Sequence, residues 1–384
     1  MPCFLYLGDS LKFIKKIPHK FSIYFLVAIF IAILFFGLRP KDFSYSNGVN
    51  WITDRAGIHF RKYGIAYADH FNEKTEDNTF KSNNLSLEIA LRIEKPYNNG
   101  FNFIFALHNG KDSDQLLLAQ YRSWIVFMNG DDYAHKRKTN RISIDTALLP
   151  DGPLFLTMTT GSTGTKLFCD GKLVQEKKDL TLDFPSGEKS RLLLGNSLYG
   201  AHPWEGDVYG LAFYRSTLTD EDIAVHFIRW SEEHDFSFAK TDKPLVLFLF
   251  NEKEGEWAND NTAGNHPLNI QKEIKILERK ILVPPWQDFK FDENNIEDIL
   301  LNVIGFMPLG FFLFATLNGR SGRSMKHGIL ITAILCFVLS LFIEIIQAWI
   351  PSRNSSMTDL ISNTFGGWIG SIALKFPLRK GFSF

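Results

Sequence analysis

Hydrophobic residues follow two different patterns along this chain, and the change between them divides it into three parts. Four segments are predominantly apolar, at residues 21–38, 296–317, 328–350 and 357–376. An α-helix rises about 1.5 Å per residue, so about 20 such residues cross a hydrocarbon core of about 30 Å. The pattern therefore predicts an all-α bundle of four transmembrane helices, the last three forming one membrane region at residues 296–376.

The first apolar segment is predicted to remain in the protein as a membrane anchor. Residues 21–38 contain no charged side chain. A cleaved signal peptide is the alternative, but residues 35–38 (Phe-Phe-Gly-Leu) lack the small-residue pattern of a cleavage site. We therefore expect a cytoplasmic N-terminus at residues 1–20 and the first transmembrane helix at residues 21–38.

Between the first and second apolar segments the period of the pattern changes to two residues. Leu85–Ile93 alternates strictly between apolar and polar positions, which is typical of a half-buried strand. Asp170 and Gly171 separate two alternating runs, and this dipeptide favours a two-residue hairpin because both turn residues need positive φ. Short strands separated by turn residues predict an all-β sandwich domain at residues 41–271.

Several strands of this region resemble those of the LamG-like, concanavalin A-like jelly-roll family. The resemblance rests on the Asp170-Gly171 hairpin, on residues 192–196, and on residues 204–214 followed by 218–223. In that family such a strand precedes a short helix, and here Thr219 suits the N-cap of one. Residues 245–255 resemble a strand and turn usually found near the start of such domains, which leaves the strand order open.

The resemblance implies a ligand-binding sandwich, and a few of its residues suit a sugar or a calcium ion. Tryptophan rings stack on sugars, and loop carboxylates bind hydroxyls or calcium. The alternative is a core tryptophan and solvated loops. The candidate contacts are Asp112, Asp114, Trp124, Asp131, Asp132 and Trp204.

A linker at residues 272–295 leads from the sandwich to the second apolar segment. Pro284 and Pro285 preclude one continuous helix into the membrane, and Trp286 suits the membrane interface. A short tail at residues 377–384 follows the last segment.

The apolar segments near the C-terminus carry an ordered set of polar residues. Two triplets share the spacing i, i+4, i+7, so each lies on one face of its helix. The segment between the triplets holds Glu344 and Gln347, also on one face, and a short connection with Arg353 follows. Charged groups inside membrane spans are costly and mark sites. The triplets are Asp298, Asn302, Gly305 and Asp359, Asn363, Gly366.

This part of the chain resembles the VanZ-like membrane family. The resemblance rests on residues 302–310 (Asn-Val-Ile-Gly-Phe-Met-Pro-Leu-Gly), on residues 344–347, on Arg353, and on Asp359 with Asn363, Gly366 and Gly370. It covers residues 281–376 and, less specifically, the first apolar segment. The resemblance implies a membrane bundle and an association with low-level glycopeptide antibiotic resistance.

The polar set has structural and functional interpretations. Asp298 and Asp359 suit helix N-terminal caps, and Glu344 suits an ion pair with Arg353. Three carboxylates nevertheless share the region with one arginine, so a proton relay, a lipid headgroup amine and a divalent ion remain open. We predict that these side chains form one membrane pocket: Asp298, Asn302, Glu344, Gln347, Arg353, Asp359 and Asn363.

The basic residues indicate the orientation of the four predicted spans. Lysines and arginines flank the segments on the N-terminal side, after the second span and in the tail, whereas the loop after the third span has only Arg353. The positive-inside rule then predicts a multi-pass protein of the cell membrane, with the β domain outside the cytoplasm and the pocket in the outer half of the membrane.

Composition excludes some classes of function. The 42 basic and 42 acidic residues balance, which argues against a nucleic-acid partner. Cys3, Cys169 and Cys336 fall in different compartments, so no disulfide is expected within the sandwich. No metal-binding or phosphate-loop motif is present in the sequence, and no cofactor is expected beyond a calcium ion in the sandwich.

Together the patterns predict an envelope membrane protein that binds rather than catalyses. Its external sandwich would take a carbohydrate or glycopeptide, tethered to the VanZ-like bundle and its outer-leaflet pocket. The alternative is an intramembrane enzyme, or a transporter of envelope lipids, that acts through Glu344 and the Asp/Asn pairs. A third hypothesis gives the sandwich protein partners only.

Overall fold

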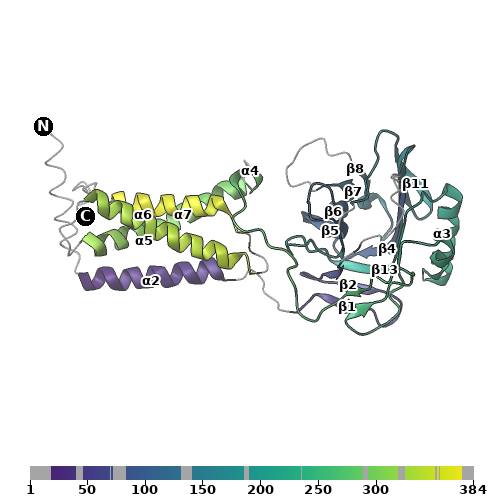
Figure 1. The fold of residues 1–384 in the computed structure, drawn as a ribbon, viewed down its shortest axis with the longest axis horizontal. Helices are drawn as coiled ribbons and strands as arrows, with labels where there is room; N and C mark the ends of the chain where they lie inside the picture. The colour runs from purple at the N-terminus through teal and green to yellow at the C-terminus, as the bar shows by residue number, and fades with distance from the viewer. Residues whose placement is uncertain are drawn as a thin grey trace. The chain divides into compact units, whose positions relative to one another are not determined.

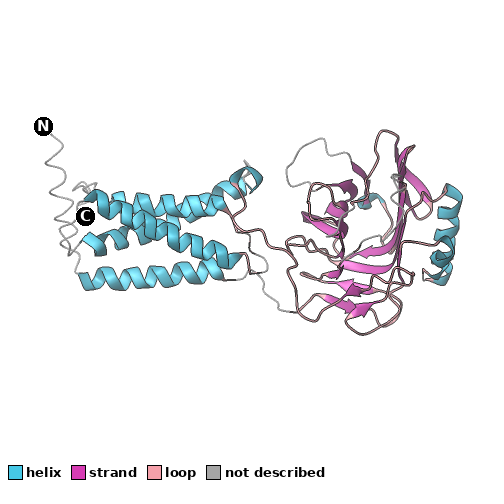
Figure 2. Ribbon diagram, viewed as in Figure 1, coloured by secondary structure: helices cyan, strands magenta, loops and turns pink. Residues whose placement is uncertain are grey.

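The computed structural model describes residues 19–39, 46–69, 71, 84–130, 141–185, 190–234, 236–288, 293–318, 325–350, 353 and 355–373 (Figures 1 and 2). The chain divides into two compact units, one formed by Met1–Phe43 with Arg279–Phe384 and the other by Ser44–Glu278. Most of the predicted cytoplasmic N-terminus and the whole tail lie outside the described residues, as do Cys3, Asp131 and Asp132.

The unit of Ser44–Glu278 is a sandwich of two antiparallel sheets, which confirms the predicted all-β architecture (Figure 2). The first sheet has the order β1 (Val49–Trp51), β2 (Ile58–Phe60), β13 (Gly206–Tyr214), β4 (Leu85–Ile93), β9 (Leu154–Gly161), β10 (Gly164–Cys169) and β11 (Lys172–Lys177), with β14 (Val246–Phe248) beside β13. The second has the order β15 (Trp257–Ala258), β16 (Leu268–Asn269), β3 (Ala66–Ala68), β12 (Arg191–Leu194), β5 (Asn98–His108), β6 (Leu116–Arg122), β7 (Trp124–Asn129) and β8 (Arg141–Asp145). The apolar core between them includes Phe105, Phe127 and Phe213.

Two local predictions are confirmed at their residues. Asp170 and Gly171 have φ values of 50° and 70° and join β10 to β11, where Cys169 pairs with Lys172. Thr219 caps α3 (Asp220–Glu233) and forms a capping box with Asp222. Because β14 pairs with β13, the segment after α3 returns to the first sheet.

The strand β4 differs from the half-buried strand that its alternation predicts. Its residues from Leu85 to Leu91 are all buried, because α3 and the 3-10 helix η3 (Ser237–Asp242) cover the outer face of the first sheet. A second 3-10 helix, η2 (Thr146–Leu148), follows β8. Ser86 and Glu88, two polar positions of β4, therefore face protein rather than solvent.

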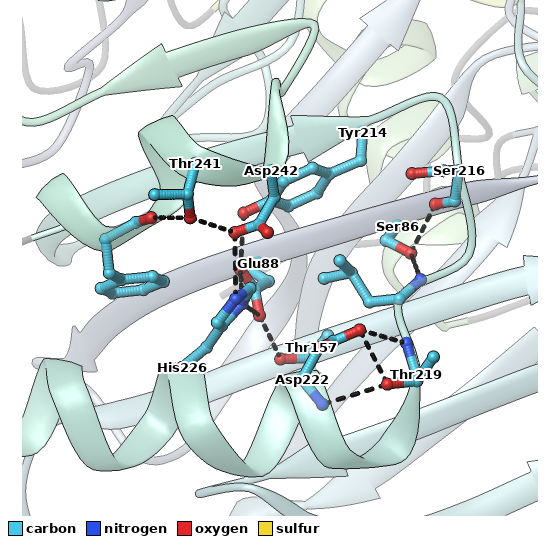
Figure 3. Close-up of polar contacts among 12 residues, drawn as sticks. Ser86, Glu88, Thr157, Tyr214, Ser216, Thr219, Asp222, His226, Thr241 and Asp242 are labelled. Carbon is cyan, nitrogen blue, oxygen red and sulfur yellow. Dashed lines mark hydrogen bonds and ion pairs between the residues drawn. The ribbon is translucent and has the colours of Figure 1, made fainter.

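A buried charge network ties this helical cover to β4 (Figure 3). The Nδ1 atom of His226 on α3 lies 3.0 and 3.1 Å from the two carboxylate oxygens of Glu88, which is fully buried. The Nε2 atom of His226 lies 3.1 Å from Asp242 of η3, and the Tyr214 hydroxyl donates to Glu88 over 2.9 Å. Burial alone would lower the pKa of His226, but the hydrogen bond and charge of Glu88 outweigh it and raise that pKa.

The other unit is a helical bundle (Figure 1). Its helices are α2 (His19–Leu38), the short α4 (Pro285–Asp288), α5 (Glu293–Asn318), α6 (Met325–Gln347) and α7 (Met357–Ala373). Within the described residues, three helical stretches are long and apolar enough to cross a membrane: Lys20–Leu38, Asn295–Leu317 and Lys326–Gln347. The prediction of four spans is thus corrected to three, since the 17 described residues of α7 extend only about 26 Å.

Glycines allow α7 to pack closely along α5. A Cβ atom on Gly366 would collide with the carbonyl oxygen of Val303, and one on Gly370 with that of Met307. In the opposite direction, a Cβ on Gly310 would meet the backbone of Gly367. Such close backbone contact is typical of helix pairs in membranes.

Candidate functional site

A cavity of about 680 Å³ lies in the helical bundle, at the end where α2 and α6 finish and α5 and α7 begin. All seven side chains of the predicted membrane pocket line it, since alternating helix directions bring their segments to one end. The cavity also has an apolar wall on α2. Its lining residues are Ile29, Ala32, Ile33, Phe36, Gly37, Asp298, Leu301, Asn302, Gly305, Phe306, Pro308, Ile343, Glu344, Gln347, Arg353, Asp359 and Asn363.

The guanidinium of Arg353 binds the C-terminal end of α2. Its Nη2 atom donates to the carbonyl oxygens of Phe36 and Arg39, each over 2.9 Å, and its Nε atom donates to Arg39 over 3.2 Å. The last carbonyl groups of a helix lack intrahelical donors and carry partial negative charge. Arg353 therefore caps α2 and joins it to the connection between α6 and α7.

Glu344 is buried near the end of α6, with 1% of its surface exposed. Its Oε2 atom accepts a hydrogen bond of 2.8 Å from the backbone N–H of Ser356, directly before α7. The Ser356 hydroxyl in turn accepts from the N–H of Thr358 over 3.0 Å. A carboxylate at this place satisfies a backbone donor at a helix N-terminus and is favoured by the helix dipole.

The two Asp/Asn pairs of the triplets make different contacts. Asn302 on α5 donates from Nδ2 to Asp359 on α7 over 2.9 Å, which joins the two triplets directly. Asn363 donates from Nδ2 to the hydroxyl of Ser340 on α6 over 3.0 Å. Asp298 lies five residues inside α5 and is exposed, so it is not the N-cap of that helix.

Two amide oxygens at the cavity are buried without a hydrogen-bond donor among the described residues. They are Oε1 of Gln347 and Oδ1 of Asn363. Gln347 donates from Nε2 to the carbonyl of Gly37 over 2.8 Å. A carbonyl can only accept, so this bond fixes the orientation of the Gln347 amide.

Gly305 differs from the glycines that pack α5 against α7. A Cβ atom on Gly305 would meet nothing within 4 Å, and the residue lines the cavity. Glycine inside a helix costs about 0.5–1 kcal/mol relative to alanine, and packing does not require it here. The matching residue of the other triplet, Gly366, is a packing position, so the two triplets are not structurally equivalent.

Sequence reasoning missed the contribution of α2, of Ser340 and of Ser356. Phe36 and Gly37 offer backbone carbonyls, which leave no side-chain signal in an apolar segment. Ser340 lies one turn before Glu344 in an otherwise apolar helix, and this spacing is the signal that would have found it.

In the sandwich, three of the candidate sugar and calcium residues, Trp204, Asp112 and Asp114, make contacts within the protein. Trp204 is fully buried, and its indole N–H donates to Gln120 over 3.2 Å, so no face of its ring reaches a ligand. Asp112 accepts from the Tyr199 hydroxyl over 2.9 Å and lies 3.1 Å from His108, while Asp114 accepts from Ser113. Among the described residues, no three His, Cys, Asp or Glu side chains group closely enough to hold a metal ion.

Trp124 lies on the second sheet in a line of paired residues from β5 to β8, which we call the aromatic row. Phe101 on β5 pairs with Tyr121 on β6, Tyr121 with Trp124 on β7, and Trp124 with Asp145 on β8. Directly paired residues project on the same face, here the outer face of the second sheet. Trp124 is 42% exposed. The row of Phe101, Tyr121, Trp124 and Asp145 thus offers rings and a carboxylate together.

Two family models match the chain. Residues 243–378 match the family described as VanZ/LLP1, and residues 69–224 match the concanavalin A-like lectin/glucanases superfamily. Both resemblances predicted from the sequence are confirmed: the chain joins a VanZ-like region to a concanavalin A-like domain. The VanZ-like region and the apolar helices identify a membrane protein. No curated protein matches the chain.

Solved structures similar to the chain include two proteins with low identity. The receptor-binding domain of botulinum neurotoxin C/D mosaic serotype is 18% identical over 48% of this chain and 45% of its own, with a TM-score of 0.36. The CBM40 domain of Ruminococcus gnavus IT-sialidase, bound to α2,3-sialyllactose, is 14% identical over 46% of this chain and 95% of its own, with a TM-score of 0.33. The chain spans less than half the length of the neurotoxin domain.

Proposed function

We propose that this chain is an envelope membrane protein whose sandwich binds a carbohydrate or glycopeptide outside the cytoplasm. The aromatic row carries this proposal. A sugar ring has apolar faces that pack on aromatic side chains, and its hydroxyls donate to a carboxylate. Trp124 and Tyr121 supply the rings at adjacent paired positions, and Asp145 supplies the acceptor beside them.

The match to the lectin/glucanases superfamily supports the same class of ligand. The composition of the row favours binding over catalysis at this surface, because Asp145 is the one carboxylate among its four residues and glycoside hydrolysis ordinarily needs a pair. The row is therefore proposed as a binding surface. The resemblance to VanZ-like proteins makes a glycopeptide antibiotic one ligand to test.

The external location of the sandwich is part of the proposal. The lysines before α2 favour a cytoplasmic N-terminus, and one crossing by α2 then carries residues 44–278 to the other side. One crossing by α2 suffices for this location, with three membrane spans as with four.

A glycan panel tests the binding proposal. The full chain, purified in phosphatidylcholine nanodiscs, would be screened against sugars and a glycopeptide antibiotic. We expect Trp124→Ala to weaken binding of the best ligand by roughly tenfold, as the loss of a stacking contact of about 1.4 kcal/mol implies.

Trp257→Ala is the matched control. Trp257 is 52% exposed on β15, six strands from β7 in the same sheet and thus about 29 Å away. This variant should bind as the native chain does. Absence of any glycan binding, or equal losses in both variants, would contradict the proposed surface.

A further inference from the structure

The two amide oxygens without donors make the bundle cavity a place for a ligand that donates hydrogen bonds. Gln347 and Asn363 are 7% and 5% exposed, and both line the cavity. Their free acceptors, Oε1 and Oδ1, are buried. Leaving such an acceptor unmet costs stability, so a donor that reaches it gains binding energy.

The charge of the lining favours a cation. Among the described residues that line the cavity, Asp298, Glu344 and Asp359 carry carboxylates and Arg353 is the one cationic side chain. The guanidinium of Arg353 is engaged with the carbonyl groups at the end of α2. Since the described residues contain no metal-binding group of His, Cys, Asp and Glu, an organic cation fits better than a metal ion.

The apolar wall and the depth of the cavity favour a lipid. Trp349 lies five residues after Glu344 and is 59% exposed, as suits the membrane interface. The Arg279 guanidinium carbon lies 3.6 Å from the centroid of the Trp349 ring. Glu344 therefore lies about 8 Å below that level. On α2 the lining continues from Phe36 to Ile29, about 10 Å further along the helix.

We propose that this cavity binds the primary ammonium headgroup of an amphipathic lipid. The ammonium carries three N–H donors and one positive charge, which match the acceptors of Gln347 and Asn363 and the carboxylate of Glu344. The apolar chain lies along the α2 wall at Ile29 and Ile33. Gly305 leaves the space that the headgroup occupies.

Lipid retention by the full chain tests this assignment. The protein would be reconstituted in nanodiscs of equimolar phosphatidylethanolamine, phosphatidylcholine and phosphatidylglycerol, and the retained lipid identified by native mass spectrometry. We expect several-fold enrichment of phosphatidylethanolamine. Choline has the charge without N–H donors and glycerol has no cation, so equal retention of either lipid would overturn the ammonium assignment.

Two variants at the cavity and one control variant connect lipid retention to the cavity. A Cβ atom at Gly305 meets nothing within 4 Å, so Gly305→Leu should occupy the space and abolish the enrichment, whereas Ala28→Leu, a change of the same kind at an exposed position of α2, should preserve it. Glu344→Gln keeps the shape and removes the charge, so enrichment should fall. If Glu344→Gln fails to fold, the enrichment in Gly305→Leu tests the proposal by itself. Unchanged enrichment of phosphatidylethanolamine in Gly305→Leu would overturn the proposal.

Competition by soluble amines separates the two possible sources of an ammonium group. Dodecylamine has an ammonium and an apolar chain, and ethanolamine has the headgroup only. Dodecylamine should displace phosphatidylethanolamine, and ethanolamine at the same concentration should not. Equal displacement by both would overturn the lipid assignment and indicate a site for small amines.

Discussion

At the scale of single residues, buried charge decides how α3 is held on the first sheet. Glu88 is fully buried on a central strand, and its charge is met by His226, which also contacts Asp242. A surface pair between β10 and the same helix, Lys166 with Asp220, has a similar N–O distance of 2.8 Å but is far more exposed. The two pairs separate the effect of burial from that of geometry.

We predict that His226→Gln destabilises the sandwich by about 3–5 kcal/mol, because it leaves the Glu88 carboxylate buried without its cation. Lys166→Gln, the matched surface change, should cost about 1 kcal/mol or less. Urea unfolding followed by circular dichroism measures both. Similar values for the two variants would contradict the role given to the buried network.

The raised pKa of His226 also predicts a pH dependence. A histidine whose pKa is higher in the folded state binds its proton more tightly there. Its contribution is complete below the unfolded value of about 6.5 and is lost as pH rises through the folded value. The free energy of unfolding should fall over this window in the native protein, and this component of the fall should be missing in His226→Gln.

At the scale of elements, the glycines at matching positions of the two triplets have different roles. Gly366 on α7 is a packing position, whereas Gly305 on α5 lines the cavity. A side chain on Gly366 would collide with the backbone of Val303, whereas one on Gly305 enters open space. The helix pair is therefore expected to tolerate a larger side chain at Gly305 but not at Gly366. The sequence repeat alone does not distinguish the two.

Gly366→Leu should lower the melting temperature of the detergent-purified chain strongly, since overpacking typically costs about 1–3 kcal/mol and a backbone collision more. Gly305→Leu should melt at or near the native temperature. Both are followed by the amount of monodisperse protein after heating. A Gly305→Leu chain as unstable as Gly366→Leu would show that the cavity is not open at that glycine.

Local chemistry explains which elements the sequence predicted. The Asp170-Gly171 hairpin and the Thr219 cap follow from the φ angles and backbone donors that those residues serve. The burial of both faces of β4 did not follow, because a cover that arrives from α3, more than a hundred residues away, leaves no mark on the strand itself. The contribution of α2 to the cavity was not predicted either, because its polar groups there are backbone carbonyls, which leave no side-chain signal.

At the scale of the whole molecule, the inserted sandwich has its own core and its own sheets, so we expect it to fold alone. Cys169 is buried, and burial raises the pKa of its thiol to about 12, so the thiol is unreactive at neutral pH. A soluble fragment of residues 44–278 should melt cooperatively, with the same midpoint with and without reductant. An aggregated fragment, or a midpoint that shifts with reductant, would contradict this.

The central claim is that the sandwich lies on the external side of the membrane and binds sugar through the aromatic row. Binding of the best fluorescent glycan to intact cells that express the native chain, Trp124→Ala or Trp257→Ala tests both parts at once. The account predicts saturable binding for the native chain and for Trp257→Ala, and a loss of roughly tenfold in affinity for Trp124→Ala at equal surface abundance. Binding that appears only after the cells are permeabilised, or that Trp124→Ala leaves unchanged, would contradict it.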